Sequence, residues 1–294
     1  MHVRHPLFTA ILSIGALTAV LDEAAAVNVV PNDGFESISS CPTGFGQTFL
    51  AAPWDTPNTG TSDVYNTCVT GWPPFPVPGV PLSPFGFQNP RTGIGMAGII
   101  PYSSAVDYRE YITAPLTSTL APGNYQVSFY VNLADTAGLA LDRIGAYFSV
   151  GSVGPVPNYA PLPYTPQIES PANVFLTDKV NWMQISGTFT AAGGENWITI
   201  GSFHDDANTN LTPVVGDWPG GTYYFIDDVT VQVAPPPTDQ ACCLPDGSCA
   251  IMLPGECQAA NGTTVPNVTT CTPSPCNPTA NRRKSWGEIK TIYR

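Results

Sequence analysis

The chain has 294 residues and a formal net charge of −12 at pH 7, with 22 acidic and 10 basic side chains. Hydrophobic residues make up 43% and aromatic residues 11% of the chain, which excludes an intrinsically disordered protein. Between residues 27 and 281 the only basic side chains are Arg91, Arg109, Arg143 and Lys179. Because such an acidic body repels phosphate backbones, we exclude nucleic acid as a partner.

Residues 1–26 have the pattern of a secretory signal peptide. Arg4 precedes an apolar run from Leu7 to Leu21, and small residues end the segment at Ala26. A membrane anchor is the alternative, but it needs about 20 apolar residues, and Asp22 interrupts this run. We therefore expect a secreted or surface-located protein without a membrane span, whose 8 cysteines form disulfides.

The first part of the expected mature chain, residues 37–95, is rich in turns and proline. The run PPFPVPGVPLSPFGF prevents any central strand, so we expect long loops. Cys41 and Cys68 are the only cysteines in the first 240 residues, and we expect them to pair. Closing a loop of about 27 residues stabilises the fold by on the order of 3 kcal/mol in the chain-entropy model.

Strand signals become regular after Gly95, and each is followed within a few residues by Gly, Pro or Asp. In 125–133 the odd positions are apolar, which places them in a core. The chain shows no convincing helical period, and 32 prolines and 27 glycines suit a loop-rich β protein. We predict an all-β antiparallel sandwich. Its expected strands are Met96 to Ile100, Tyr108 to Ala114, Tyr125 to Leu133, Arg143 to Val150, Trp182 to Thr190, Trp197 to Phe203 and Thr222 to Val233.

The last of these strands carries two adjacent carboxylates, Asp227 and Asp228. Neighbouring side chains of a strand point to opposite faces, so at least one aspartate faces the core unless a bulge re-aims it. The opening segment VNVVPNDGFE offers a third carboxylate, Glu36. We expect the first and last strands to lie together, with Glu36 and Asp227 or Asp228 holding a structural Ca²⁺.

The opening VVPNDGFE and the closing YYFIDDVTV resemble the two ends of CenC-type carbohydrate-binding modules. The runs between them, among them YREYI, IGAYFS and ISGTFTAAGGENWITIGSF, are similar to a domain of secreted and surface bacterial proteins. The resemblance covers residues 27–234 and implies a galactose-binding-like jelly roll. It also implies a structural calcium at Glu36 and the aspartate pair, and it leaves the ligand open.

Sugar binding needs flat aromatic faces beside side chains that hydrogen-bond hydroxyl groups. Loop aromatics that could serve a polysaccharide or a cell-surface glycan are Trp54, Trp72, Phe85, Phe87 and Trp218. The same residues could instead be buried staples of the loops. In that case the protein would be a structural or adhesive surface component without a small ligand.

Catalytic motifs are absent from the sequence. His204 is the only histidine after residue 26, and its SFHDDANTN setting is typical of a solvated loop. Two carboxylates suffice for glycoside hydrolysis, so a hydrolase built on a pair among Glu110, Glu169, Glu195, Asp205 and Asp206 stays as a third hypothesis. We interpret the protein as non-enzymatic.

A second module follows a proline linker at residues 235–240. Residues 241–276 are too few to bury an adequate core, so we expect three disulfides, with 15 possible connectivities. Zinc is less suitable because the segment has no histidine. It resembles the CCLPDGSC-type repeats of modular secreted proteins. The six cysteines are Cys242, Cys243, Cys249, Cys257, Cys271 and Cys276.

The final segment, residues 277–294, is basic. Ser285 and Glu288 form a capping-box pattern, and Trp286, Ile289 and Ile292 could share one face of a short helix. Two interpretations stay open. The segment docks to an export apparatus or the cell envelope, or it is a frayed tail.

Overall fold

The computed structural model describes residues 27–69 and 77–276. The expected signal peptide, Trp72 and the basic tail lie outside these residues, as do the two hypotheses about the tail. Within the described residues, no helix has both the length and the apolar character needed to cross a membrane.

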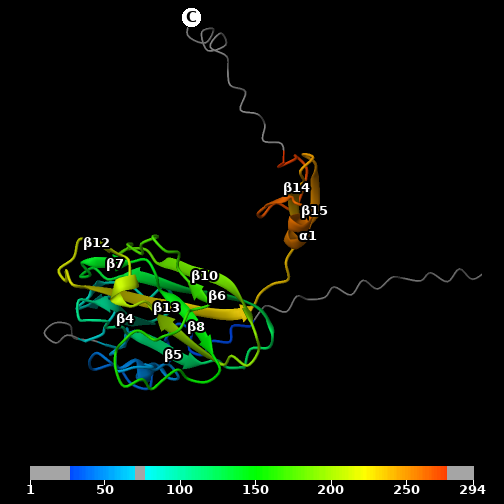
Figure 1. The fold of residues 1–294 in the computed structure, drawn as a ribbon. Helices are drawn as coiled ribbons and strands as arrows, with labels where there is room; N and C mark the ends of the chain where they lie inside the picture. Colours follow the sequence, from blue (N-terminus) through cyan, green and yellow to red (C-terminus); the bar gives the residue numbers. More distant parts are fainter. Residues whose placement is uncertain (1–26, 70–76, 277–294) are drawn as a thin grey trace, which may run out of the picture.

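Two antiparallel sheets form the large domain, and the chain passes repeatedly from one to the other, as in a jelly roll (Figure 1). One sheet has the order β1-β4-β13-β6-β10 and the other β5-β11-β8-β9. The first comprises β1 (Asp63–Asn66), β4 (Gly95–Ser103), β13 (Gly221–Val233), β6 (Gly123–Leu133) and β10 (Met183–Ala191). The second comprises β5 (Tyr111–Pro115), β11 (Trp197–Gly201), β8 (Gly145–Ser149) and β9 (Ile168–Glu169). The prediction of an all-β antiparallel jelly roll is confirmed.

The core fills the space between the two sheets, as the alternation of the strands predicts. Val127, Phe129 and Val131 of β6 are fully buried, and so are Ile198 and Ile200 of β11. Each of the seven expected strands is present, with bounds that differ by a few residues. Alternating apolar residues therefore identify the inner face correctly.

Short elements lie outside the seven expected strands. The segment 37–95, expected to consist of loops, contains the edge strand β1 and a small hairpin. These elements have two to four residues each, too few for a periodic signal. They are the sheet strands β1 and β9, the hairpin strands β2 (Leu82–Ser83) and β3 (Gly86–Phe87), the pair β7 (Leu139–Leu141) and β12 (Leu211–Pro213), and the 3-10 turns Thr48–Ala51 and Asp206–Asn208.

The small module is a three-stranded sheet with one short helix, held by three disulfides. It comprises β14 (Gln240–Cys243), β15 (Cys249–Met252), α1 (Pro254–Ala259) and β16 (Thr263–Val265), with the sheet order β15-β14-β16. Its connectivity is Cys242–Cys257, Cys243–Cys276 and Cys249–Cys271. In the large domain Cys41 pairs with Cys68, as expected. All 8 cysteines are thus oxidised, the state expected of an exported protein.

Candidate functional site

Loop residues cover part of the outer face of the five-stranded sheet. Phe85 stacks on Tyr223 of β13 with ring centroids 3.7 Å apart, and Phe45 meets the edge of Phe85 at 5.5 Å. Trp218 is half-buried in the same cluster. Phe85 and Trp218, both proposed as ligand platforms, therefore serve mainly to hold loops against the sheet.

Trp54 does not belong to the ligand-binding set. Its side chain is 1% exposed and packs on Phe35 at a centroid distance of 5.0 Å. Its indole N–H donates to the Asn32 carbonyl at 2.9 Å. A ring buried in this way offers no face to a ligand, so the prediction for Trp54 is wrong. The sequence misled because a tryptophan in a polar loop carries no mark of whether the loop folds over it.

Among the aromatic candidates that the structure describes, Phe87 is the exception, because 57% of its surface is exposed. It ends the β2–β3 hairpin, and its backbone N–H donates to Asp135 Oδ2 at 2.9 Å. A Cβ at Gly86 would overlap the Asp135 side chain, and Gly86 has φ +126°, so only glycine allows this approach. The hairpin thereby fixes the Phe87 ring at the surface.

A pocket of about 340 Å³ opens beside this ring. It is lined by Phe87, Gln88, Asn89, Asp135, Lys179 and Val180, and we call it the Phe87 pocket. Val180, on its rim, is 78% exposed. The pocket thus combines an aromatic face with two amide side chains and one carboxylate.

The ammonium donors of Lys179 are not available to a ligand. Its ammonium group donates to the carbonyl oxygens of Asp135, Ala137 and Val215 at 2.6 to 2.7 Å. Burial lowers the pKa of Lys179 from its ordinary value. Three carbonyls use all three donors of an ammonium group, so the pocket offers the Asp135 carboxylate but no free ammonium donor.

The start and the end of the large domain lie side by side. The backbone N–H of Val29 donates to Val231 O, and that of Val229 donates to Asp33 O, both at 2.9 Å. Asn28 adds a side-chain bridge, accepting from Val231 N at 2.8 Å. This pairing places Glu36 next to β13, as the sequence analysis expected, although residues 27–36 form no strand of their own.

Glu36 and Asp227 share one small space around Gly34. A Cβ built on Gly34 would lie 3.2 Å from Glu36 Oε1 and 3.5 Å from Asp227 Oδ1. Glu36 Oε2 accepts from Ile94 N at 2.7 Å, but the buried Oε1 has no hydrogen-bond partner. A buried carboxylate oxygen without a donor is costly unless a cation or a proton satisfies it.

Asp227 is fully buried on the outer face of β13. Burial, followed by the charge of Asp228, raises its pKa from the ordinary value to about 8. Its carboxylate accepts from the backbone N–H groups of Asp228 (2.8 Å), Arg91 (2.6 Å) and Thr92 (3.3 Å). Without a cation, the carboxyl group of Asp227 is therefore poised to hold a proton near neutral pH.

Asp228 turns away from this space because of the bulge that the sequence analysis allowed for. The register with β6 shifts between Asp227 and Thr230, and Asp228 has φ +50°. Its carboxylate pairs with the Arg91 guanidinium and accepts from Thr92 Oγ1 at 2.5 Å. Arg91 in turn lies 3.5 Å over the Tyr130 ring. Asp228 is thus neutralised by an arginine of the chain.

The donor set fits a hard cation at Glu36 and Asp227 only in part. Nowhere in the described residues do three or more His, Cys, Asp or Glu side chains come together in a way that could hold a metal ion. The two carboxylates, of which that of Glu36 has an oxygen without a hydrogen-bond partner, suit Ca²⁺. This ion also accepts main-chain carbonyls and water as ligands. A calcium ion here would need such oxygens for the rest of its coordination.

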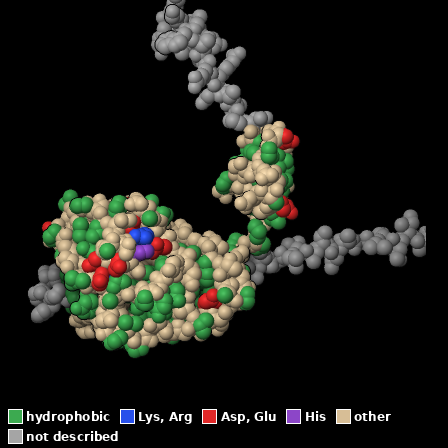
Figure 2. Space-filling view, viewed as in Figure 1, with side chains coloured by type: hydrophobic (Ala, Val, Ile, Leu, Met, Phe, Trp, Pro, Cys, Tyr) green, Lys and Arg blue, Asp and Glu red, His purple; other side chains and the backbone are tan. Residues whose placement is uncertain are grey.

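The carboxylates considered for hydrolysis are engaged elsewhere. Glu110 is buried and accepts from Tyr108 Oη at 2.6 Å, and Glu169 pairs with His204 at 2.8 Å. Glu195 accepts from the backbone of the turn before it. Figure 2 shows a histidine side chain beside acidic and basic side chains on one face of the large domain. None of these carboxylates lines the Phe87 pocket.

A buried polar network on the outer sheet face escaped the sequence analysis. Tyr223 Oη donates to Asp63 Oδ2 at 2.6 Å and bonds Tyr65 Oη at 2.7 Å. Burial raises the pKa of Asp63 well above its usual range. The segment SDVYN shows one acidic residue before a tyrosine and gives no sign that both are buried.

No family model and no curated protein matches the chain. Solved structures with a similar outline include the carbohydrate-binding module TmCBM61 in complex with beta-1,4-galactotriose, with 17% identity, TM-score 0.31, and coverage of 70% of this chain and 97% of that one. The K1 cleaved adhesin domain of Lys-gingipain from Porphyromonas gingivalis has 14% identity, TM-score 0.36, and coverage of 69% and 96%. A CBM22-1 xylan-binding domain from Paenibacillus barcinonensis has 12% identity, TM-score 0.34, and coverage of 69% and 94%. The functional argument therefore rests on the geometry of the site.

Proposed function

We propose that the jelly roll is a secreted, non-catalytic module that binds a polysaccharide or cell-surface glycan at the Phe87 pocket. The observation that carries this proposal is the exposed Phe87 ring beside amide and carboxylate side chains. Apolar C–H faces of a sugar ring pack on an aromatic ring, and its hydroxyl groups hydrogen-bond to Asn89 and Asp135.

The ligand class follows from the charges of the pocket. Asp135 is exposed, and the Lys179 ammonium is already saturated by carbonyl oxygens. A sulfated or uronic acid polysaccharide would find no free ammonium donor there, and the charges of Asp135 and Lys179 offset each other. The pocket therefore favours a neutral polysaccharide.

Binding is favoured over hydrolysis because the pocket has a single carboxylate. Glycoside hydrolysis uses a pair of carboxylates flanking the scissile bond, and Asp135 has no acidic neighbour among the lining residues.

A structural or adhesive component without a small ligand is the second candidate, supported by the burial of Trp54 and the stacking of Phe85.

A structural calcium ion at Glu36 and Asp227 completes the proposal. It would coordinate Glu36 Oε1, which has no hydrogen-bond partner, and balance the negative charge of this carboxylate. It would also favour the ionised form of Asp227. Its role is to hold the opening segment against β13. Asp228, paired with Arg91, is not included.

The proposal is tested by sedimentation of the secreted protein with insoluble neutral polysaccharides and by gel retardation with soluble neutral and acidic ones. We expect retention on at least one neutral polysaccharide and no retardation by acidic ones. Phe87→Ala should release the protein from the retaining matrix. Absence of binding to a broad neutral panel would favour the second candidate.

A further inference from the structure

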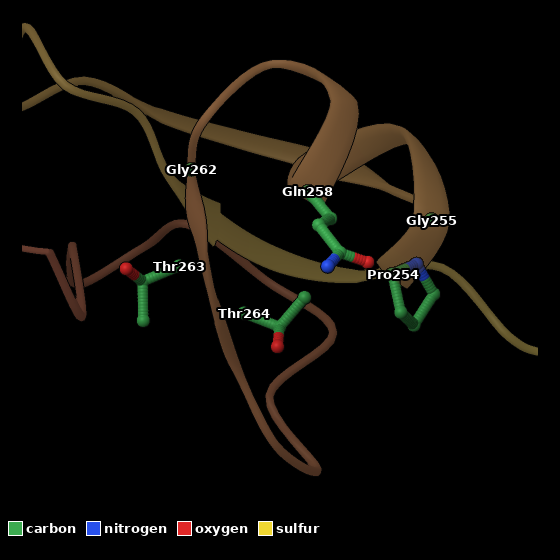
Figure 3. A pocket seen from close by; sticks show the side chains of 6 residues that line it. All are labelled: Pro254, Gly255, Gln258, Gly262, Thr263 and Thr264. Atoms are coloured by element: carbon green, nitrogen blue, oxygen red, sulfur yellow. The ribbon is translucent and has the colours of Figure 1, made fainter.

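The small module has a groove between its helix and the edge of its sheet. The groove has a volume of about 370 Å³ and is lined by Pro254, Gly255 and Gln258 of α1 and by Gly262, Thr263 and Thr264. Figure 3 shows the Gln258 amide on the helix side and the threonine side chains on the strand side. None of the lining side chains is charged.

One wall of the groove is an edge strand. The sheet order β15-β14-β16 leaves β16 paired only with β14 in the part of the chain that the structure describes. An edge strand presents backbone N–H and C=O groups to any extended segment that lies beside it. The groove therefore has the form of a site in which an extended segment pairs with β16 as an additional strand, beside helix α1.

The two walls are held at a fixed separation. The disulfide Cys242–Cys257 joins β14 to α1, and a Cβ on Gly262 would overlap Cys242 Sγ. A Cβ on Gly255 would meet nothing within 4 Å, so the helix side is open. A site that is already shaped loses less entropy on binding.

We propose that residues 286–294 of this chain occupy the groove as an added strand beside β16. Cys276, the last residue that the structure describes, lies next to the site, because it is bonded to Cys243, which lies opposite Thr263 in the β14–β16 pair. The intervening residues 277–285 extend to about 30 Å, which is enough to return to β16.

Charge and sequence both suit this occupant. Residues 235–276 contain Asp239, Asp246 and Glu256 and no basic side chain, whereas residues 282–294 contain five Lys or Arg and one Glu. Ile289, Thr291 and Tyr293 alternate along the tail, and all three residue types favour strands. The helical pattern of Trp286, Ile289 and Ile292 overlaps with this alternation, and pairing with β16 selects the strand.

Hydrogen exchange of the intact chain, read by mass spectrometry, tests the proposal. A tethered segment has an effective concentration in the millimolar range, so a dissociation constant of about 100 µM would slow exchange at residues 263–265 about tenfold. We expect this protection to disappear when residues 282–294 are deleted. A synthetic peptide of residues 282–294 should restore it, and a scrambled peptide should not.

Two substitutions on the same helix separate groove binding from general effects. Gly255→Trp fills the groove and should abolish the protection, while Ala259→Trp, an exposed position outside the lining, should leave it intact. Three results would each overturn the proposal. They are equal exchange with and without the tail, equal protection by the scrambled peptide, and protection that falls on dilution, which would indicate a second copy as the donor of the strand.

Discussion

Tyr223 Oη reaches across strand β4 to donate to Asp63 Oδ2 at 2.6 Å. Its ring lies over Gly98, where a Cβ would overlap the Tyr223 hydroxyl. Asp63 belongs to β1, at the edge of the five-stranded sheet, and Tyr223 to β13, at its centre. The bond thus ties the edge strand to the centre without passing through the backbone ladder.

Removal of the Tyr223 hydroxyl should destabilise the domain more than removal of its neighbour. Tyr223→Phe leaves a buried Asp63 oxygen without its donor, which costs about 2 to 3 kcal/mol of unfolding free energy. Tyr65→Phe loses only the bond to Tyr223 and should cost about 1 kcal/mol. Urea unfolding measures both values. Equal losses of unfolding free energy in the two variants would show that the bond from Tyr223 to Asp63 adds no stability beyond that of the bond between the two tyrosines.

Calcium should raise the melting temperature of the large domain. At a calcium concentration 100 times its dissociation constant the gain is about 2.7 kcal/mol, or about 5 to 10 °C for a domain of this size. Glu36→Gln keeps the acceptor for Ile94 N and should abolish the response to a chelator. Asp239→Asn, an exposed change of equal charge in the linker, should leave it unchanged. A Glu36→Gln variant that still responds would exclude this site.

In chelator, the stability of the domain should fall as the pH rises from 5 to 9. The pKa of Asp227 is raised to about 8 in the folded state by burial and by Asp228, against about 4 in an unfolded chain. The folded state therefore binds the proton more tightly, and this stabilisation is complete below pH 4 and lost as the pH rises through 8.

The variant Asp227→Asn separates the contribution of Asp227 to the pH dependence of stability from the contributions of other titrating groups. Burial also raises the pKa values of Asp63 and Glu110, so a shallower decline of the same sign should remain. Denaturant unfolding at several pH values gives the slope. A slope identical to that of the unchanged protein would mean that Asp227 titrates normally.

The sequence predicts the sandwich well because the strands that build its core are long and alternate. Val127, Phe129 and Val131 mark an inner face without any tertiary information. The pairing of Cys41 with Cys68 was also predictable, by elimination. The contact between the start and the end of the large domain was predictable from their acidic residues.

The loops were harder to predict, since exposure there depends on long-range contacts. Trp54 and Phe87 are both aromatic residues in polar, proline-containing segments, yet one is 1% and the other 57% exposed. The difference arises from Asn32, which accepts from Trp54, and from Asp135, which holds the hairpin of Phe87. Neither partner is near in sequence. The pocket residues Gln88 and Lys179 were missed for the same reason.

The affinity of two phenylalanine variants for the retaining neutral polysaccharide tests the central claim most directly. Phe87 and Phe49 are 57% and 55% exposed, but only Phe87 lines the pocket. Stacking of a sugar on Phe87 worth about 1.4 kcal/mol predicts a tenfold rise in the dissociation constant for Phe87→Ala and no significant change for Phe49→Ala. Equal affinities of both variants and the unchanged protein would contradict the assignment of the Phe87 pocket as the binding site.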